Sequence, residues 1–152
     1  MSDMIRVTIP GTPFPQPRAR STRAGITYTP AAARDWKGTA QHHMLVARGE
    51  QPILTGPVEL HIAAIFPLPQ SKWRVTSIVP RQPHTGKRDV DNIAKAVMDA
   101  GNGVLWHDDG QVYRLTVEKW IGAQGEAART EIIVTGHEKN ACDRARQSDY
   151  TR

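Results

Sequence analysis

Alternation of apolar and polar residues predicts four β-strands. Ile5, Val7 and Ile9 alternate with polar residues near the start of the chain, and residues 57–66 alternate in the same way. Two further alternating runs, 112–121 and 130–135, follow a turn at Asp108-Asp109-Gly110. Proline-rich segments follow the first two strands, where the missing amide hydrogen of proline ends a hydrogen-bonded ladder.

Apolar residues spaced three and four apart predict two helices. The first covers 30–48: Thr29-Pro30 is a favourable start and Gly49 a stop. The second begins at Asp89 or Val90 and ends near Asn102, before Gly103. The order strand, helix, strand, helix, strand, strand predicts an α/β fold, a single mixed β-sheet with two main helices packed on it. The apolar stripes are Ala33, Trp36, Ala40, Met44 and Ala47 in the first helix, and Ile93, Ala96, Val97 and Ala100 in the second.

The length of 152 residues suits one domain. We assign 1–136 to this domain and expect 137–152 to be a flexible C-terminal tail, because it lacks apolar periodicity. No apolar run approaches the roughly 18 residues of a membrane span, and the N-terminus lacks the core of a signal peptide. The single cysteine, Cys142, excludes an intrachain disulfide and a cysteine-cluster zinc site. We therefore expect a soluble, cytoplasmic protein with no membrane partner.

Basic residues gather in two segments that we expect to be loops. The chain holds 20 Lys and Arg against 15 Asp and Glu, a net charge of +5 that fits a polyanionic partner but is common in unrelated proteins. Residues 67–88 form a long loop, and loops of this length usually have a function. Within this loop, Trp73 is the aromatic residue that we expect to contact a ligand. The basic residues of the two segments are Arg18, Arg20 and Arg23, and Lys72, Arg74, Arg81, Lys87 and Arg88.

Two pairs of acidic residues flank the second predicted helix. Asp89 and Asp91 fall in its first turn, where the simplest interpretation is capping. Asp108-Asp109 by itself is an ordinary turn. However, a helix of about 12 residues is about 18 Å long, and residues 103–109 can span about 23 Å. The chain could thus return along the helix and place Asp109 beside Asp89 and Asp91, where three carboxylates would need a divalent cation such as Mg²⁺ or Mn²⁺.

Lys95 follows Asp91 by four residues and therefore shares its helical face. It either forms a surface ion pair with Asp91 or, beside a metal, stabilises the charge of a phosphate. Asp99, one turn further, suits a structural role. His107 is either a solvated turn residue or a base or ligand. Acids that hold a cation beside bases that hold phosphate indicate metal-assisted phosphodiester hydrolysis, and the lack of a G-x-x-x-x-G-K-S/T motif argues against a nucleotide cofactor.

Three segments resemble the signature of the RusA family of Holliday junction resolvases, the crossover junction endodeoxyribonucleases. They are Arg88-Asp-Val-Asp-Asn-Ile-Ala-Lys95, Met98-Asp-Ala100 and Trp106-His-Asp-Asp-Gly-Gln-Val112. The N-terminal Gly11-Thr-Pro, Pro17-Arg-Ala-Arg20 and Tyr28-Thr-Pro30 are similar to the phage-type members. The resemblance covers roughly residues 5–136. The chain departs from the family at Gln16, where a basic residue is often found, and at Ala100-Gly101, where the family commonly has Ala-Leu.

The resemblance implies a homodimeric, Mg²⁺-dependent endodeoxyribonuclease that binds four-way DNA junctions and nicks opposed strands in DNA recombination and repair. Genes of this family are often carried by prophages. Matching positions make Asp89, Asp91 and Asp109 the metal-binding carboxylates and Lys95 the catalytic lysine, with Asp108 also in the motif. Two other functions stay open, a non-catalytic branched-DNA-binding module and a metal-dependent phosphatase. The expected DNA-binding residues are Arg18, Arg20, Arg23, Lys72, Arg74, Lys87 and Arg88.

Overall fold

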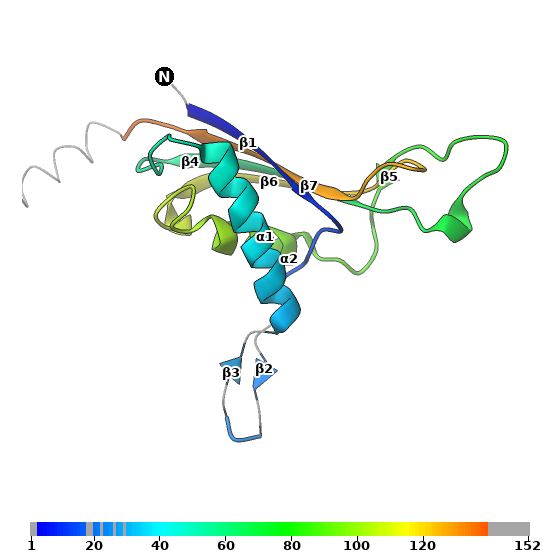
Figure 1. The fold of residues 1–152 in the computed structure, drawn as a ribbon, viewed down its shortest axis with the longest axis horizontal. Helices are drawn as coiled ribbons and strands as arrows, with labels where there is room; N and C mark the ends of the chain where they lie inside the picture. Colours follow the sequence, from blue (N-terminus) through cyan, green and yellow to red (C-terminus); the bar gives the residue numbers. More distant parts are fainter. Residues whose placement is uncertain (1–2, 18–19, 22, 26, 29, 140–152) are drawn as a thin grey trace, which may run out of the picture.

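A computed structural model describes residues 3–17, 20–21, 23–25, 27–28 and 30–139, with the backbone alone for 20–21 and 27–28. Its main feature is a five-stranded mixed sheet in the order β1-β7-β4-β6-β5 (Figure 1). Neighbouring strands are antiparallel except β4 and β6, which run parallel. The predicted fold class is confirmed. The strands are β1 Asp3–Pro10, β4 Val58–Phe66, β5 Gln82–Pro83, β6 Val112–Ile121 and β7 Arg129–Gly136.

Two helices pack on one face of this sheet, α1 (Ala31–Arg48) and α2 (Val90–Gly101) (Figure 1). Their apolar stripes join one core with the inward residues of β1, β4 and β7, as the spacing predicts. Pro30 is the N-cap of α1 and not its first residue, and Gly49, with φ of 57°, follows the last turn. No helix in the described part of the chain has the length and apolar composition of a membrane span.

The C-terminal end of α2 is fixed by Trp106, which is fully buried and donates from Nε1 to Asn102 Oδ1 at 2.8 Å. Its ring lies so close to Gly101 that a Cβ there would be 2.3 Å from a ring carbon. A leucine would therefore collide with the indole. In this chain Gly101 thus leaves room for the indole, at the position where the family commonly has leucine.

Two segments that the sequence predicted only as loops contain short elements. Residues 20–28 include a two-stranded ribbon of β2 (Arg20–Ser21) and β3 (Thr27–Tyr28). The long loop 67–88 includes β5 and the 3₁₀ turn η1 (Gln70–Lys72). Strand periodicity could not predict β2, β3 and β5, because each has only two residues.

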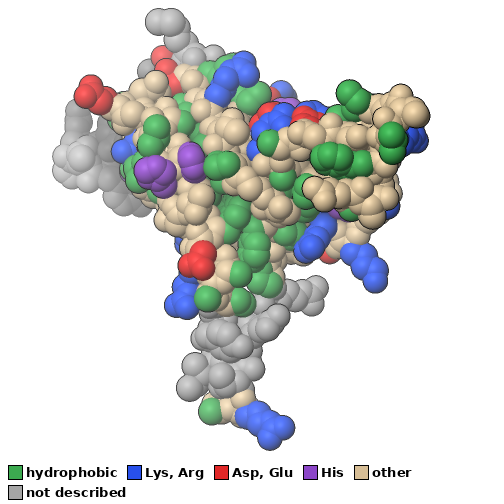
Figure 2. Space-filling model, turned by 45° about the vertical axis from the view of Figure 1, so that its right-hand side comes forward, with side chains coloured by type: hydrophobic (Ala, Val, Ile, Leu, Met, Phe, Trp, Pro, Cys, Tyr) green, Lys and Arg blue, Asp and Glu red, His purple; other side chains and the backbone are tan. Residues whose placement is uncertain are grey.

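Gln124 holds the base of the long loop. Its side chain accepts from the backbone N–H of Arg74 at 3.0 Å and donates to the carbonyl of the same residue at 3.0 Å. Beyond this anchor, Val75 and Ile78 are 103% and 73% exposed. In the view of Figure 2, hydrophobic and basic side chains lie together on the lobe at the upper right, where this loop projects. The loop thus exposes apolar side chains on a fixed base.

An ion-pair network joins this loop to the turn before β7. The Glu126 carboxylate accepts from the guanidinium of Arg81, from the Ala123 N–H at 2.9 Å and from Arg129 at 3.1 Å. These bonds lower the pKa of Glu126 from 4.5 to about 2, with the Arg81 hydrogen bond as the largest cause. Arg81, one of the basic residues of the loop, is therefore occupied within the protein.

The low pKa of Glu126 predicts a defined loss of stability in acid. Because the folded carboxylate has a pKa of about 2 against an ordinary 4.5, it stabilises the fold above pH 4.5 and ceases to do so as the pH falls to 2. We expect Glu126→Gln to lower Tm by several degrees at pH 7, and the difference from wild type to vanish near pH 2. Thermal unfolding followed by circular dichroism measures this, with Glu50→Gln as the control. A difference that persists unchanged at pH 2 would contradict the assignment.

Candidate active site

Asp89 and Asp91 begin α2 with both side chains exposed. Asp89 occupies the N-cap position, yet its side chain makes no capping hydrogen bond, and Asp91 lies in the first turn. Neither carboxylate accepts a hydrogen bond or forms an ion pair with any residue that the structure describes. Capping therefore does not occupy Asp89, and two carboxylates in the same turn of the chain remain available to a ligand.

The first turn of α2 is held from both sides by backbone contacts. Lys119 of β6 donates from Nζ to the carbonyl of Gly86 at 3.0 Å and to that of Arg88. The N–H of Gln16 donates to the Asn92 carbonyl at 3.0 Å. These contacts place the two carboxylates beside the C-terminal part of β6, on rigid elements. No pattern in the sequence predicts this role of Lys119, because its partners are backbone groups more than 30 residues away.

His84 lies in the segment that leads into this turn. Its ring packs edge-on against Phe66, with the ring centroids 4.9 Å apart. Burial lowers the pKa of His84, and the charges of Lys119 and Arg88 lower it further. The lowered pKa disfavours a positive charge on this ring.

Lys95 is exposed one turn after Asp91. Within the described residues it forms no ion pair, so the simple Asp91–Lys95 surface pair is not made. Asp99, one turn further, is partly buried and borders a depression with Trp36 and Lys37. Lys95 is thus free to hold an anion beside the two carboxylates.

The second acidic pair is built into a tight 3₁₀ turn, η2 (Asp109–Gln111). Asp108 caps it by accepting from the Gly110 N–H at 3.1 Å, while Gln111 Oε1 accepts from the His107 and Asp108 N–H groups. Gln111 also donates from Nε2 to the Leu54 and Gly56 carbonyls. Asp108 therefore has a structural role, His107 is exposed, and Asp109 is half-buried with its carboxylate in none of these bonds.

The structure does not bring Asp109 to Asp89 and Asp91 within one chain. The Gly103 N–H donates to the Trp106 carbonyl and the Leu105 N–H to Gly101, so the loop after α2 folds onto the helix end instead of returning along it. Asp109 then precedes β6 at the end where Val112 pairs with Val58, whereas Asp89 lies beside Lys119. The seven residue-to-residue steps of strand from Val112 to Lys119 span about 23 Å. In the described ranges no group of three His, Cys, Asp or Glu could hold a metal ion.

The predicted DNA-binding residues that the structure describes lie in three segments of the chain. Lys87 and Arg88 are exposed directly before α2, and Lys72 and Arg74 are exposed in the long loop. Arg23 is exposed between β2 and β3, while the side chain of Arg20 is not described and Arg18 lies outside the described residues. None of the described ones appears in a side-chain ion pair with another described residue. Their charges are therefore available to an external anion.

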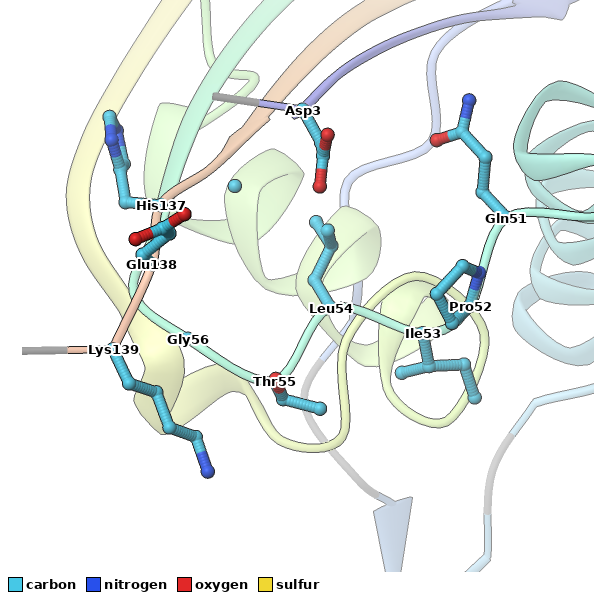
Figure 3. Close-up of a pocket in the computed structure, with 11 residues that line it drawn as sticks. Asp3, Gln51, Pro52, Ile53, Leu54, Thr55, Gly56, His137, Glu138 and Lys139 are labelled. Atoms are coloured by element: carbon cyan, nitrogen blue, oxygen red, sulfur yellow. The ribbon is translucent and has the colours of Figure 1, made fainter. Parts of the chain in front are cut away.

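A hollow of about 510 Å³ lies at the other end of the sheet (Figure 3). It is lined by Asp3, residues 51–56 and residues 136–139, and Leu54 rises from its floor toward Asp3. None of the predicted site residues lines it. His137, at the start of the expected tail, donates its N–H to the Pro57 carbonyl, and residues 140–152 of that tail lie outside the described residues.

Comparison with known proteins assigns the family. The family model described as "Endodeoxyribonuclease RusA" matches residues 10–135. The chain belongs to the RusA family. An uncharacterized protein of Bacillus subtilis (strain 168), YqaN, is 35% identical over 144 residues, 87% of this chain and 96% of YqaN. The matched range contains both acidic motifs together with α2 and β6. The exposed carboxylates therefore lie within the part of the chain that matches the endodeoxyribonuclease family.

Proposed function

We propose that the protein is a Mg²⁺-dependent, structure-selective endodeoxyribonuclease that nicks four-way DNA junctions as a homodimer in the cytoplasm, in DNA recombination and repair. One observation carries the proposal: Asp89 and Asp91 are exposed and unpaired at the start of α2, with Lys95 free on the next turn, in a RusA-family chain. Exposed carboxylates beside an exposed ammonium, none of them paired with a described residue, suit a cation and a phosphate.

The donor set fits Mg²⁺, with Mn²⁺ as the alternative. Asp89 and Asp91 offer hard oxygen ligands on a rigid turn, and magnesium is usually held by one or two carboxylates together with water and substrate phosphate. When bound, the ion would supply a polarised phosphate and an activated water. Asp89 and Asp91 would hold it, and Lys95 would stabilise the negative charge that develops on the phosphate.

Asp109 is the third proposed ligand, and its position favours a site shared between two subunits. In one chain it lies at the opposite end of β6 from Asp89 and Asp91. We propose that the partner subunit's Asp109 completes the carboxylate set. Two such sites related by a two-fold axis would nick opposed strands symmetrically.

The exposed basic residues would hold the DNA backbone around this site. Lys87 and Arg88 precede the carboxylates, and Lys72 and Arg74 extend the positive charge along the long loop. Trp73, 44% exposed between them, would stack on a base that the junction leaves unpaired. Arg18, Arg20 and Arg23 belong to the same proposed surface.

Cleavage of a synthetic four-way junction with and without Mg²⁺ tests the function, with linear duplex of the same sequence as the control substrate. We expect paired nicks in the junction only, and none in EDTA. Retention of the junction without nicking in Mg²⁺ would favour the non-catalytic DNA-binding module. Affinity for DNA that hardly falls with salt would instead favour a phosphatase, since such an enzyme has no need of the basic loops.

A further inference from the structure

The outer edge of β6 is open along most of its length. On one side β6 pairs with β4 from Val112 to Ile121, but on the other only Trp120 and Ile121 pair with β5. Between Val112 and Glu118, no backbone group of a described residue bonds to that outer edge. An unpaired edge of this kind is a template for another strand, and proteins usually blunt it or cover it.

The β6 edge carries apolar side chains and no proline. Tyr113 and Leu115 are 56% and 42% exposed, and the four consecutive residues 113–116 are all exposed. Leu115 lies opposite the fully buried Leu60 of β4, so it extends the core face beyond the cover of the helices. The other edge strand, β1, differs because Ile5, Val7 and Ile9 are all buried and Pro10 ends it.

The direction of the free backbone groups follows from one hydrogen bond. The Lys119 carbonyl accepts from the His84 N–H and therefore points to the outer edge. Alternate residues of a strand point their N–H and C=O to the same side, so those of Leu115 and Val117 also point outward. A second strand could bond to these two residues without disturbing the pairing with β4.

We propose that two copies of the chain pair along this edge, antiparallel and with Thr116 on the two-fold axis, so that one sheet runs through both subunits. The proposal rests on the homodimer of the proposed function and names its interface. In this register Leu115 faces the partner's Val117 and Arg114 faces the partner's Glu118. Each pair occurs twice by symmetry, which makes the edge complementary to itself.

The two charges of this register are exposed, and their contacts within the chain are long. The side chains of Arg114 and Glu118 are 63% and 43% exposed. Arg114 contacts Glu59 at 3.5 Å, while Glu118 contacts His61 at 3.5 Å and accepts from Trp120 Nε1 at 3.3 Å. The neighbouring register, centred on Leu115, would place Arg114 opposite threonine and lose both charge pairs. Because the two strands run antiparallel, the start of the partner's β6 lies beside the C-terminal end of β6 in the first subunit. The acidic turn that precedes the partner's β6 is thereby directed toward Asp89 and Asp91.

Charge reversal tests the interface, measured by sedimentation without DNA or metal. Arg114→Glu and Glu118→Arg each place like charges opposite each other twice, and each should raise the dimer Kd at least about tenfold. The double variant restores opposite charges and should return Kd to within about threefold of wild type. Arg6→Glu, on the opposite edge strand, is the matched control and should leave Kd unchanged. A monomeric wild type, or a double variant as weak as the single ones, would overturn the proposal.

Cross-linking tests the register in a Cys142→Ser background. Thr116→Cys places two thiols in a directly opposed, non-hydrogen-bonded pair with Cα atoms about 4.5 Å apart, within the range of a disulfide. We expect a covalent dimer on mild oxidation of this variant and none with Leu115→Cys. The reverse result would overturn the register. Because neither test uses DNA, a dimer that forms as described but never cleaves a junction would contradict the proposed function alone.

Discussion

Asp91→Asn is expected to reduce junction nicking at least about a hundredfold while the Kd for the junction stays within about threefold. The substitution keeps the size of the side chain and removes the charge that holds the cation. Affinity for DNA comes from the basic residues, which the change does not touch. Because the carboxylate makes no hydrogen bond with described residues, Tm should stay near the wild-type value. Single-turnover nicking and electrophoretic mobility in Ca²⁺ and Mg²⁺ measure the two effects.

Asp99→Asn, on the same helix, is the matched control. Asp99 lies two turns from Asp91 and is partly buried, so its loss should change nicking by less than about threefold. Equal loss of binding and cleavage in Asp91→Asn would contradict the assignment of the carboxylate to the metal. Full cleavage in Asp91→Asn would do the same.

Mixing two inactive variants separates a shared site from a site within one chain. Asp91→Asn and Asp109→Asn should each be inactive alone. Random exchange makes about half of the dimers mixed. In each mixed dimer, one of the two shared sites combines the intact Asp91 of one subunit with the partner's intact Asp109. About a quarter of all sites should therefore regain activity. The product should be a junction nicked in one strand and not a resolved one. No recovery in dimers shown to exchange would place the whole site within one chain.

The largest expected loss of stability follows removal of the buried indole at the end of α2. Trp106→Ala should lower the free energy of unfolding by about 3–5 kcal/mol. The ring is fully buried, fills the space beside Gly101 and donates its N–H to Asn102. Because the same contact directs the chain into η2, the loss should also loosen the turn that holds Asp109. Urea unfolding followed by circular dichroism measures the stability.

Trp73→Ala is the control for this experiment. Trp73 is 44% exposed in the long loop and makes one hydrogen bond, to the Leu68 carbonyl. Its removal should cost less than about 1 kcal/mol. Its proposed contact with DNA should instead weaken binding of the junction. Equal destabilisation by the two tryptophan substitutions would show that Trp106 does not hold the end of α2.

The local parts of the site follow from the sequence. The spacing of Ile93, Ala96, Val97 and Ala100 fixes which face of α2 is buried, and so leaves Asp91 and Lys95 on the exposed face. The turn at Asp108 is also determined locally, because aspartate and glutamine three residues apart can cap each other's backbone. These features depend on neighbours within four residues, which a pattern of residue types describes well.

Tertiary packing decided the remaining features. The length of residues 103–109 allowed a return along α2, but the fit of Trp106 against Gly101 and the pairing of Leu105 with Leu54 direct the chain to the far end of β6. The alternation in 112–121 predicted a strand, yet only the order of the strands shows that its outer edge is open. Contacts between residues far apart in the chain determine both, and a local pattern does not specify which distant partner a segment meets.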